Sequence, residues 1–144
     1  MELALFLPLL LLLTLGVASF SSLYVTSEQS QSATADAARY GSLHPANVSN
    51  TTPPAAESIQ GIAYFDASIP PDDLILRYYT PNTTLCGTYT ASAGFVGSGT
   101  NTLGSCSVAG NFLRITTRVP APFFDLINPE YSLSVSFTTE MLIQ

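Results

Sequence analysis

The residues of this chain that could do chemistry are few. It has one histidine, His44, and one adjacent pair of aspartates, Asp72-Asp73. A Ser-His-Asp triad would have to use His44, which precedes a proline in a turn-rich segment, whereas a general base must be held within hydrogen-bond reach of its partner. No glycine-rich phosphate loop follows a strand-like segment. We therefore predict no catalytic residue, no cofactor and no enzymatic activity.

Metal binding is not predicted either. Asp72-Asp73, together with Asp66 or Asp125, could offer oxygen ligands to calcium, but aspartate after proline is a common choice in turns and the ligand spacing of an EF-hand is missing. The two cysteines, Cys86 and Cys106, lack the C-x-x-C spacing and the histidine partners of zinc sites. Neither set resembles a ligand cluster.

The chain that positions these residues begins with an apolar N-terminal segment. No charged residue stands between Leu3 and Phe20, and a helix over this stretch would be about 27 Å long, close to the hydrocarbon thickness of a bilayer. Pro8 lies within the first two turns, where its missing donor leaves at most a kink. Such a helix can span a membrane, and it could equally be buried against copies of itself.

Two other interpretations of this segment stay open. Val17-Ala18-Ser19 could supply the cleavage site of a secretory signal peptide, although Met1-Glu2 places an acid where such a peptide has a base. An ordinary single-pass anchor is the other alternative, but no lysine or arginine precedes Leu3 to hold the N-terminus in the cytoplasm.

The following residues favour continuation of the same helix. The sequence turns polar after Phe20 but contains no helix breaker before Gly41. Ala33, Ala37 and Tyr40 keep a narrow face at helical spacing, and Gly41 stands where a helix favours a left-handed C-terminal residue. One continuous helix of about forty residues would be about 60 Å long, half membrane-like and half aqueous.

These segments resemble a known family. The run Glu2-Leu3-Ala4-Leu5-Phe6-Leu7-Pro8 with the leucines after it, followed by Ala33-Thr34-Ala35-Asp36-Ala37-Ala38-Arg39-Tyr40, is similar to the TadE/TadG group of pilin-like proteins, from the tight-adherence branch of type IV pilus systems. More loosely, residues 113–123 and 131–140 look like the last two strands of that family. The resemblance implies a protein that is inserted in the cytoplasmic membrane and then polymerises into a surface filament. The residues expected in the filament core are Met1, Glu2, Leu3, Phe6, Leu7, Pro8, Leu10 and Leu13.

Glu2 has a specific role under this resemblance. In pilins the acid of one subunit lies beside the free amine of a neighbour, because a carboxylate inside an apolar bundle is costly unless it is paired. The first turn of a helix also favours an acid. The alternative is that Glu2 lies at the membrane interface and contacts water.

The implied partners are other copies of the chain, the pilus assembly machinery and a prepilin peptidase. Prepilins carry a basic leader that this peptidase removes, and the acid of a mature pilin commonly lies a few residues in. Glu2 is the second residue, which leaves open whether Met1 is a mature terminus or an internal start.

The amino-acid composition limits the kinds of binding partner and of subunit linkage that we expect. The net charge is −6, and the chain has four arginines and no lysine. Four scattered arginines cannot neutralise a run of phosphates, so no nucleic acid is expected to bind. Sortase-type pili join their subunits through a lysine amine, so a polymer of this chain would be non-covalent.

The remainder of the chain is long enough for one small domain. We expect a helix over residues 1–41, a linker over 42–54, where prolines and asparagines discourage regular structure, and an extracellular β-rich head over 55–144. A short helix over 55–66 would start at Pro53-Pro54 and bury an inner face; a strand over 62–65 is the alternative. The residues of that inner face are Ile59, Ile62, Ala63 and Phe65.

Alternating side chains predict the strands of the head. Strands are expected over 74–79, 85–89, 112–119 and 131–143, and the last two show the clearest period of two. Only the distal half of the long helix is near enough to cover the apolar face of such a sheet. The predicted fold class is therefore α+β, with a long N-terminal helix packed by its distal half against a small antiparallel sheet, as in pilins.

Two kinds of covalent modification are predicted for the head. Cys86 and Cys106 lie in the part that this topology puts outside the cytoplasm, and an even cysteine count there predicts a disulfide worth about 3 kcal/mol through loop closure. Sequons at Asn47, Asn50 and Asn82 are candidate glycosylation sites, although such triplets are frequent in Ser/Thr-rich sequence.

Three functions fit these expectations. The first is a structural pilin that packs its helix into a filament core. The second is a minor, membrane-resident TadE-like protein that primes or caps a filament of another subunit. The third is a membrane-tethered adhesin, whose head would bind ligand without the helix.

Overall fold

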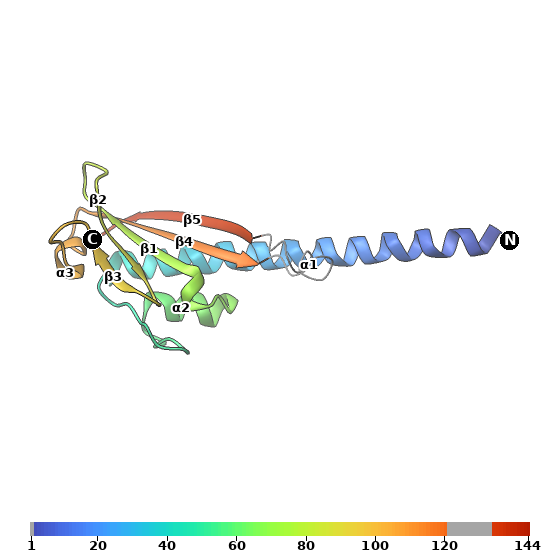
Figure 1. The fold of residues 1–144 in the computed structure, drawn as a ribbon, viewed down its shortest axis with the longest axis horizontal. Helices are drawn as coiled ribbons and strands as arrows, with labels where there is room; N and C mark the ends of the chain where they lie inside the picture. The colour runs from blue at the N-terminus through green and yellow to red at the C-terminus, as the bar shows by residue number, and fades with distance from the viewer. Residues whose placement is uncertain (1, 121–133) are drawn as a thin grey trace.

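The structure, a computed structural model, describes residues 2–120 and 134–144. Its first element, α1 (Glu2–Leu43), is a single helix of 42 residues, about 63 Å long at about 1.5 Å per residue. The N-terminal half of α1 projects from the molecule and the distal half lies along a β-sheet (Figure 1). The predicted fold class, a long helix on a small antiparallel sheet, is confirmed.

The helix does not end at Gly41, as its sequence suggested, but continues to Leu43. Gly41 serves close packing instead, because a Cβ here would lie 2.5 Å from Leu113 Cδ2 and 3.0 Å from Ile59 Cδ1. Carbon atoms in contact normally lie about 3.5–4.0 Å apart. The tertiary contact therefore overrides the local preference of glycine for a helix C-terminus.

The described part of the sheet has five antiparallel strands in the order β3-β2-β1-β4-β5. Four of them lie where strands were predicted, two from alternation and two from short apolar segments. The strand missed by sequence reasoning is β3, whose four residues include two glycines and are too few to show alternation. Tyr131 and Leu133, expected to begin the last strand, lie outside the described residues. The bounds are β1 (Leu74–Tyr79), β2 (Leu85–Thr90), β3 (Gly94–Gly97), β4 (Phe112–Pro120) and β5 (Ser134–Leu142).

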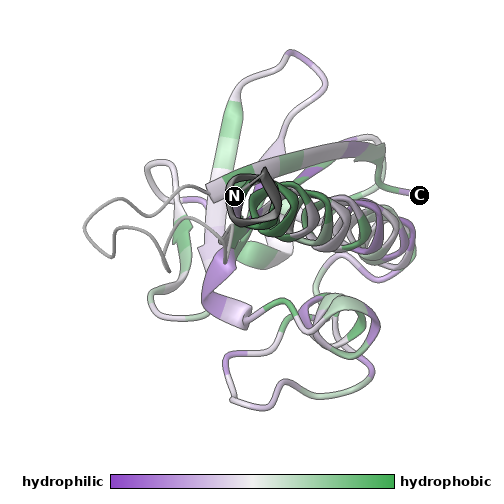
Figure 2. Cartoon of the chain, turned by 90° about the vertical axis from the view of Figure 1, so that its right-hand side faces the viewer, coloured by the Kyte–Doolittle hydropathy of each residue, from purple (hydrophilic) through white to green (hydrophobic). Residues whose placement is uncertain are grey.

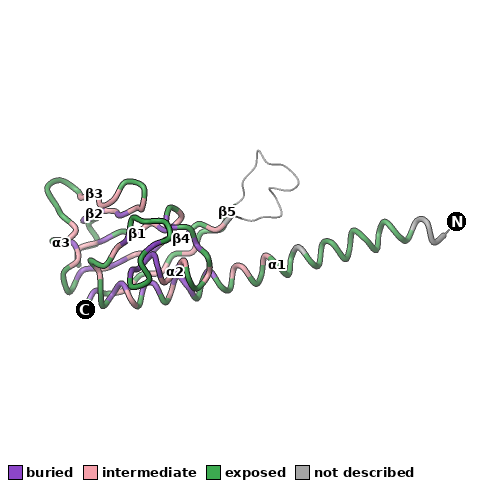
Figure 3. Tube along the Cα trace, turned by 90° about the horizontal axis from the view of Figure 1, so that it is seen from below, coloured by how far each residue is buried: buried purple, intermediate pink, exposed green. Residues whose placement is uncertain are grey.

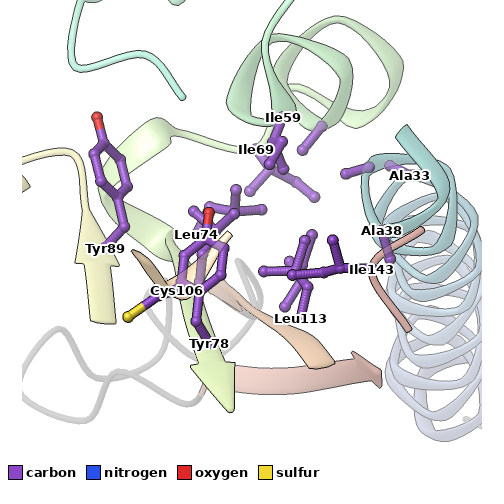
Figure 4. Close-up of a cluster of buried hydrophobic side chains, with 14 of the residues drawn as sticks. Ala33, Ala38, Ile59, Ile69, Leu74, Tyr78, Tyr89, Cys106, Leu113 and Ile143 are labelled. Atoms are coloured by element: carbon purple, nitrogen blue, oxygen red, sulfur yellow. The ribbon is translucent and has the colours of Figure 1, made fainter. Parts of the chain in front are cut away.

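One face of the sheet forms the core of the head. The register places Leu76 opposite Ile115 and Tyr78 opposite Leu113, and all four side chains are fully buried. They converge with side chains from the helices (Figure 4). Small residues on α1 allow the helix to approach the sheet closely, so its distal half is part of the core. These buried helix residues are Ser30, Ala33, Thr34, Ala37 and Ala38.

A second helix, α2 (Ile59–Ala67), packs beside α1 and begins later than predicted. Ser58 caps it by accepting a hydrogen bond from a backbone N–H of the first turn at 2.9 Å, so a serine cap rather than Pro53-Pro54 sets its start. Ala63 is buried as predicted. Phe65 is 60% exposed, so its placement on the inner face was wrong.

A buried hydroxyl pair connects α1 to β4. Thr34 Oγ1 lies 2.9 Å from Thr117 Oγ1, and both residues are fully buried. The Thr34 hydroxyl donates to the backbone oxygen of Ser30 at 2.6 Å. Because a hydroxyl has one proton, Thr117 is the donor within the pair. The Thr117 hydroxyl thus depends on Thr34 for its partner.

The segment between α1 and α2 has no helix or strand but is fixed to the head. Ser49 N donates to Gln60 Oε1 at 2.9 Å. The Tyr78 hydroxyl donates to the backbone oxygen of Pro45 at 2.6 Å. Burial raises the pKa of Tyr78, and the neighbouring Tyr89 raises it further. The connection is therefore held by one hydrogen bond that it donates to α2 and one that it accepts from β1.

Candidate functional site: the exposed half of the N-terminal helix

The N-terminal half of α1 exposes an apolar surface on every side. Ten large apolar side chains between Phe6 and Phe20 are 53–73% exposed. Leu9 to Leu13 are consecutive, so they surround the helix rather than form one stripe. Figure 2 looks along this hydrophobic helix, and Figure 3 shows it exposed as far as the head. A helix that is apolar all round is normally buried in protein or in lipid, so this surface requires a partner.

The hydroxyl groups within this half are satisfied by the helix itself. Thr14 Oγ1 donates to the backbone oxygens of Leu10 and Leu11, each at 3.0 Å. Ser21 Oγ donates to the backbone oxygen of Val17 at 2.8 Å. An unpaired polar group costs several kcal/mol in an apolar medium. These hydroxyls can therefore enter lipid or an apolar bundle.

The segment meets the requirements for a membrane span. It is long and apolar enough to cross a bilayer, and none of its most apolar window is buried. A signal sequence near an N-terminus would meet the same requirements.

Some of the predicted filament-core residues come together on one side of the helix. Phe6, Leu7 and Leu10 line a shallow furrow with Leu11 and Thr14. The furrow is almost entirely apolar, so it could receive an apolar side chain from a neighbouring helix.

The other predicted core residues lie elsewhere on the helix. Leu13 is 63% exposed and does not line the furrow. Pro8 is exposed within the helix and does not end it. Glu2 and Leu3 lie in its first turn, and Met1 is outside the described residues. The proposed pairing of Glu2 with a neighbouring amine stays a prediction.

A second apolar groove, of about 260 Å³, lies where the bare helix meets the head. Val135 and Phe137 belong to the apolar set of the alternating last strand, but Val135 is 39% exposed and both line this groove. No local signal could have found it, because α1 and β5 are far apart in the chain. The lining residues are Phe20, Leu23, Tyr24, Ser27, Val135 and Phe137.

The predicted disulfide is present. Cys86 in β2 is bonded to Cys106 in the short helix α3 (Leu103–Cys106), with their Cα atoms 5.7 Å apart. Both cysteines are buried. The bond holds the segment that contains β3 and α3 against the sheet.

The predicted sequons have different environments. The Asn47 side-chain amide donates to the Tyr40 hydroxyl at 2.9 Å and to the backbone oxygen of Glu57. A glycan would replace one of the two hydrogens on this nitrogen and so remove at least one of these hydrogen bonds. All three asparagines are exposed, so these hydrogen bonds of Asn47, rather than burial, distinguish it from Asn50 and Asn82.

The carboxylates considered for calcium do not gather. Asp72 and Asp73 lie in the turn η1 (Pro71–Asp73) that leads into β1. Within the described ranges, no group of three His, Cys, Asp or Glu side chains could hold a metal ion. Asp125 is outside those ranges. His44 stacks on Tyr40, with ring centroids 4.7 Å apart.

The architecture is α+β: a long helix, apolar in its first half, whose distal half lies on a five-stranded antiparallel sheet. The model of the TadE-like protein family matches residues 1–39. The match covers 39 of the 144 residues, nearly all of α1, and confirms the resemblance to the TadE-like family noted at both ends of this helix. The last two strands lie outside the matched residues. No curated protein and no solved structure matches the chain.

Proposed function

We propose that this chain is a structural subunit of a non-covalent helical filament on the cell surface, polymerised through α1. The observation that carries the proposal is the sleeve of ten exposed apolar side chains between Phe6 and Phe20. The family match covers the same residues. Before assembly this sleeve would hold the chain in the cytoplasmic membrane.

The energy of the sleeve explains why the helix must be covered. Fully burying one large apolar side chain stabilises by about 1.5–3 kcal/mol. With more than half of each side chain exposed, ten of them amount to about 10–20 kcal/mol before the cost of association. The isolated chain could not leave this surface in water.

Lipid and a bundle of helices cover the sleeve about equally well, because lipid tails are as apolar as leucine. Transfer from membrane to filament therefore needs additional contributions. Pairing of Glu2 with a neighbouring N-terminal amine would supply one, since it removes an unpaired charge from an apolar bundle. Contacts between heads and work by the assembly machinery would supply others.

A second function is favoured by the family match itself. As a minor TadE-like protein, the chain would remain in the membrane and prime or cap a filament made of another subunit. Both functions use the same helix, and they differ in the amount of the chain found in filaments.

The test is to image purified surface appendages and to quantify their subunits by mass spectrometry. The proposal expects this chain as the main component. Trace amounts in filaments, with loss of filaments when the chain is deleted, would favour the minor role instead.

The prediction for Glu2 uses two variants. Glu2→Ala and Glu2→Gln should both reduce the number of filaments per cell while leaving the membrane level of the chain and the circular dichroism of its head unchanged. Gln keeps the size and hydrogen-bonding atoms but not the charge. Normal filament numbers for both variants would refute the pairing.

A further inference from the structure

The apolar groove at the base of the head lies at a fixed level along α1. Its helix side runs from Phe20 to Ser27, and its strand side is formed by Val135 and Phe137. In the register of β4 and β5, Phe137 is opposite the buried Thr117, so both strand residues lie on the face of the sheet that α1 covers. β5 begins at the end of the head from which the bare helix projects (Figures 1 and 3). The groove thus continues the apolar surface of the exposed half onto the head.

The uncharged length of α1 determines where a bilayer would meet this groove. No charged residue lies between Glu2 and Glu28, and the 25 residues between them measure about 38 Å as a helix. The hydrocarbon layer of a bilayer is about 30 Å thick and takes about 20 of these residues. Counted from Leu3, it would end near Ser22, with the headgroup layer beyond. The groove, at residues 20–27 of α1, would therefore lie across this boundary.

The side chains of the groove suit that level. None of its six lining residues is charged, and Ser27 is the one farthest along α1 from the exposed half. Phe20 is 73% exposed and Tyr24 is 59% exposed. Tyrosine is enriched at membrane interfaces, where its ring contacts acyl chains and its hydroxyl reaches the polar layer. An acyl chain matches this lining better than a charged headgroup does.

The base of the head cannot lie far from this level. α1 is one unbroken helix from Glu2 to Leu43, and Ser30, ten residues beyond Phe20, is already buried in the head. Ten residues of helix rise only about 15 Å. Whenever the exposed half spans a bilayer, the helix therefore carries the base of the head into the headgroup layer.

We propose that this groove binds an acyl chain of a membrane lipid, so that β5 contacts the bilayer while the chain is in the membrane. Covering Phe20, Val135 and Phe137 with lipid removes apolar surface from water, which favours the contact. The inference rests on the membrane stage of the proposed function. It adds a second membrane contact, made by the head as well as by the helix.

The experiment uses tryptophan fluorescence, because the chain has no tryptophan of its own. The full-length chain carrying Phe137→Trp or Val135→Trp is reconstituted in phosphatidylcholine vesicles, with or without bromine atoms on the acyl chains. Bromine quenches a tryptophan that contacts those chains. Both variants should lose most of their fluorescence in brominated vesicles, and the loss should be greatest when the bromines lie near the glycerol end of the chains. Val135→Trp repeats the test at a position that is already 39% exposed, where a larger ring can be accommodated.

Two control variants report the two ends of the molecule. Leu142→Trp is the matched control on the same strand, because Leu142 is 49% exposed and lies about 17 Å along β5 from Phe137. It should keep its fluorescence. Leu13→Trp reports insertion of the helix, and it should be quenched most when the bromines lie near the methyl end of the chains.

The outcomes separate the groove from the helix. Quenching of both groove variants, with Leu142→Trp unquenched, supports the proposal. If Leu13→Trp is quenched but the groove variants behave like Leu142→Trp, the helix spans the bilayer and the acyl-chain contact is overturned. Blue-shifted emission from the groove variants without quenching would show that protein covers the groove, from the same chain or a second copy, and this result also overturns the contact.

Two further results count against the proposal in different ways. Quenching of Leu142→Trp to the same degree as the groove variants would contradict the assigned level, since the whole head would then contact lipid. If Leu13→Trp itself is not quenched, the membrane stage of the proposed function fails together with the groove contact.

Discussion

The hydroxyl pair between α1 and β4 gives an asymmetric prediction for stability. Thr34→Val and Thr117→Val each replace a hydroxyl by a methyl of nearly the same shape, and both residue types are β-branched. Thr34→Val leaves the Thr117 hydroxyl buried without its partner, which costs about 1–3 kcal/mol. Thr117→Val costs less, about 0.5–1.5 kcal/mol, because Thr34 still donates to Ser30.

The double variant distinguishes this mechanism from a simple loss of packing. Replacing both hydroxyls by apolar groups of the same shape is nearly neutral, so Thr34→Val with Thr117→Val should be more stable than Thr34→Val alone. The coupling energy of this cycle should then be about 1.5–4.5 kcal/mol in magnitude, the sum of the two single effects. For a head of this size, 1 kcal/mol shifts Tm by about 4–8 °C.

The assay is unfolding of the full-length chain in detergent micelles, followed by the near-ultraviolet circular dichroism of the head's tyrosines. Thr26→Val is the matched control, since its hydroxyl also donates within α1, to Ser22 at 2.9 Å, but has no hydrogen-bond partner on the described strands. Its effect should stay within about 0.5 kcal/mol. Equal effects of the two single variants, or effects that add in the double variant, would refute the assigned direction of the hydrogen bond.

Three further predictions concern the head and the helix. Cys86→Ser should lower the stability of the head by about 3 kcal/mol; an unchanged melting temperature without reductant would contradict it. Gly41→Ala should destabilise by about 1–3 kcal/mol through overpacking, whereas Gly16→Ala, with no atom within 4 Å of the added methyl, should not; equal melting curves would show that the core can adjust. The pKa of Tyr78 is raised in the folded chain, so the unfolded chain ionises first: stability should be complete below about pH 10 and fall above it by up to about 1.4 kcal/mol per pH unit. Tyr78→Phe should reduce this slope in alkaline melts and leave the slope contributed by Tyr89, whose pKa burial also raises.

The parts of the fold that could be predicted are those with a long, uninterrupted pattern. The helix was evident because Pro8 lies within its first two turns and no breaker stands between Phe20 and Gly41, and β4 was evident because its side chains alternate. The role of Gly41 could not be predicted, because its propensity points to a helix end while the deciding contact comes from Leu113, far along the chain. The start of α2 was misplaced because two prolines are a conspicuous signal and the cap at Ser58 is a weaker one.

The candidate site likewise has one part that the sequence predicts and other parts that depend on the tertiary fold. The apolar sleeve follows from composition alone, since an uncharged stretch of that length must be covered. The groove that Phe137 lines could not be predicted, because it exists only when β5 lies beside α1. The position of Val135 and Phe137 on the side of α1 also depends on register, and a shift by one residue would turn both to the opposite face of the sheet.

The unbroken course of α1 has a mechanical consequence. The apolar half and the half that packs against the head belong to one helix from Glu2 to Leu43. The rotational orientation of the head about the helix axis is therefore fixed by the helix itself. One residue inserted between Phe20 and Ser30 would rotate the head by about 100° and shift it by about 1.5 Å. A pulling force applied to the head would be transmitted directly along α1, because no flexible linker separates the two halves of the helix.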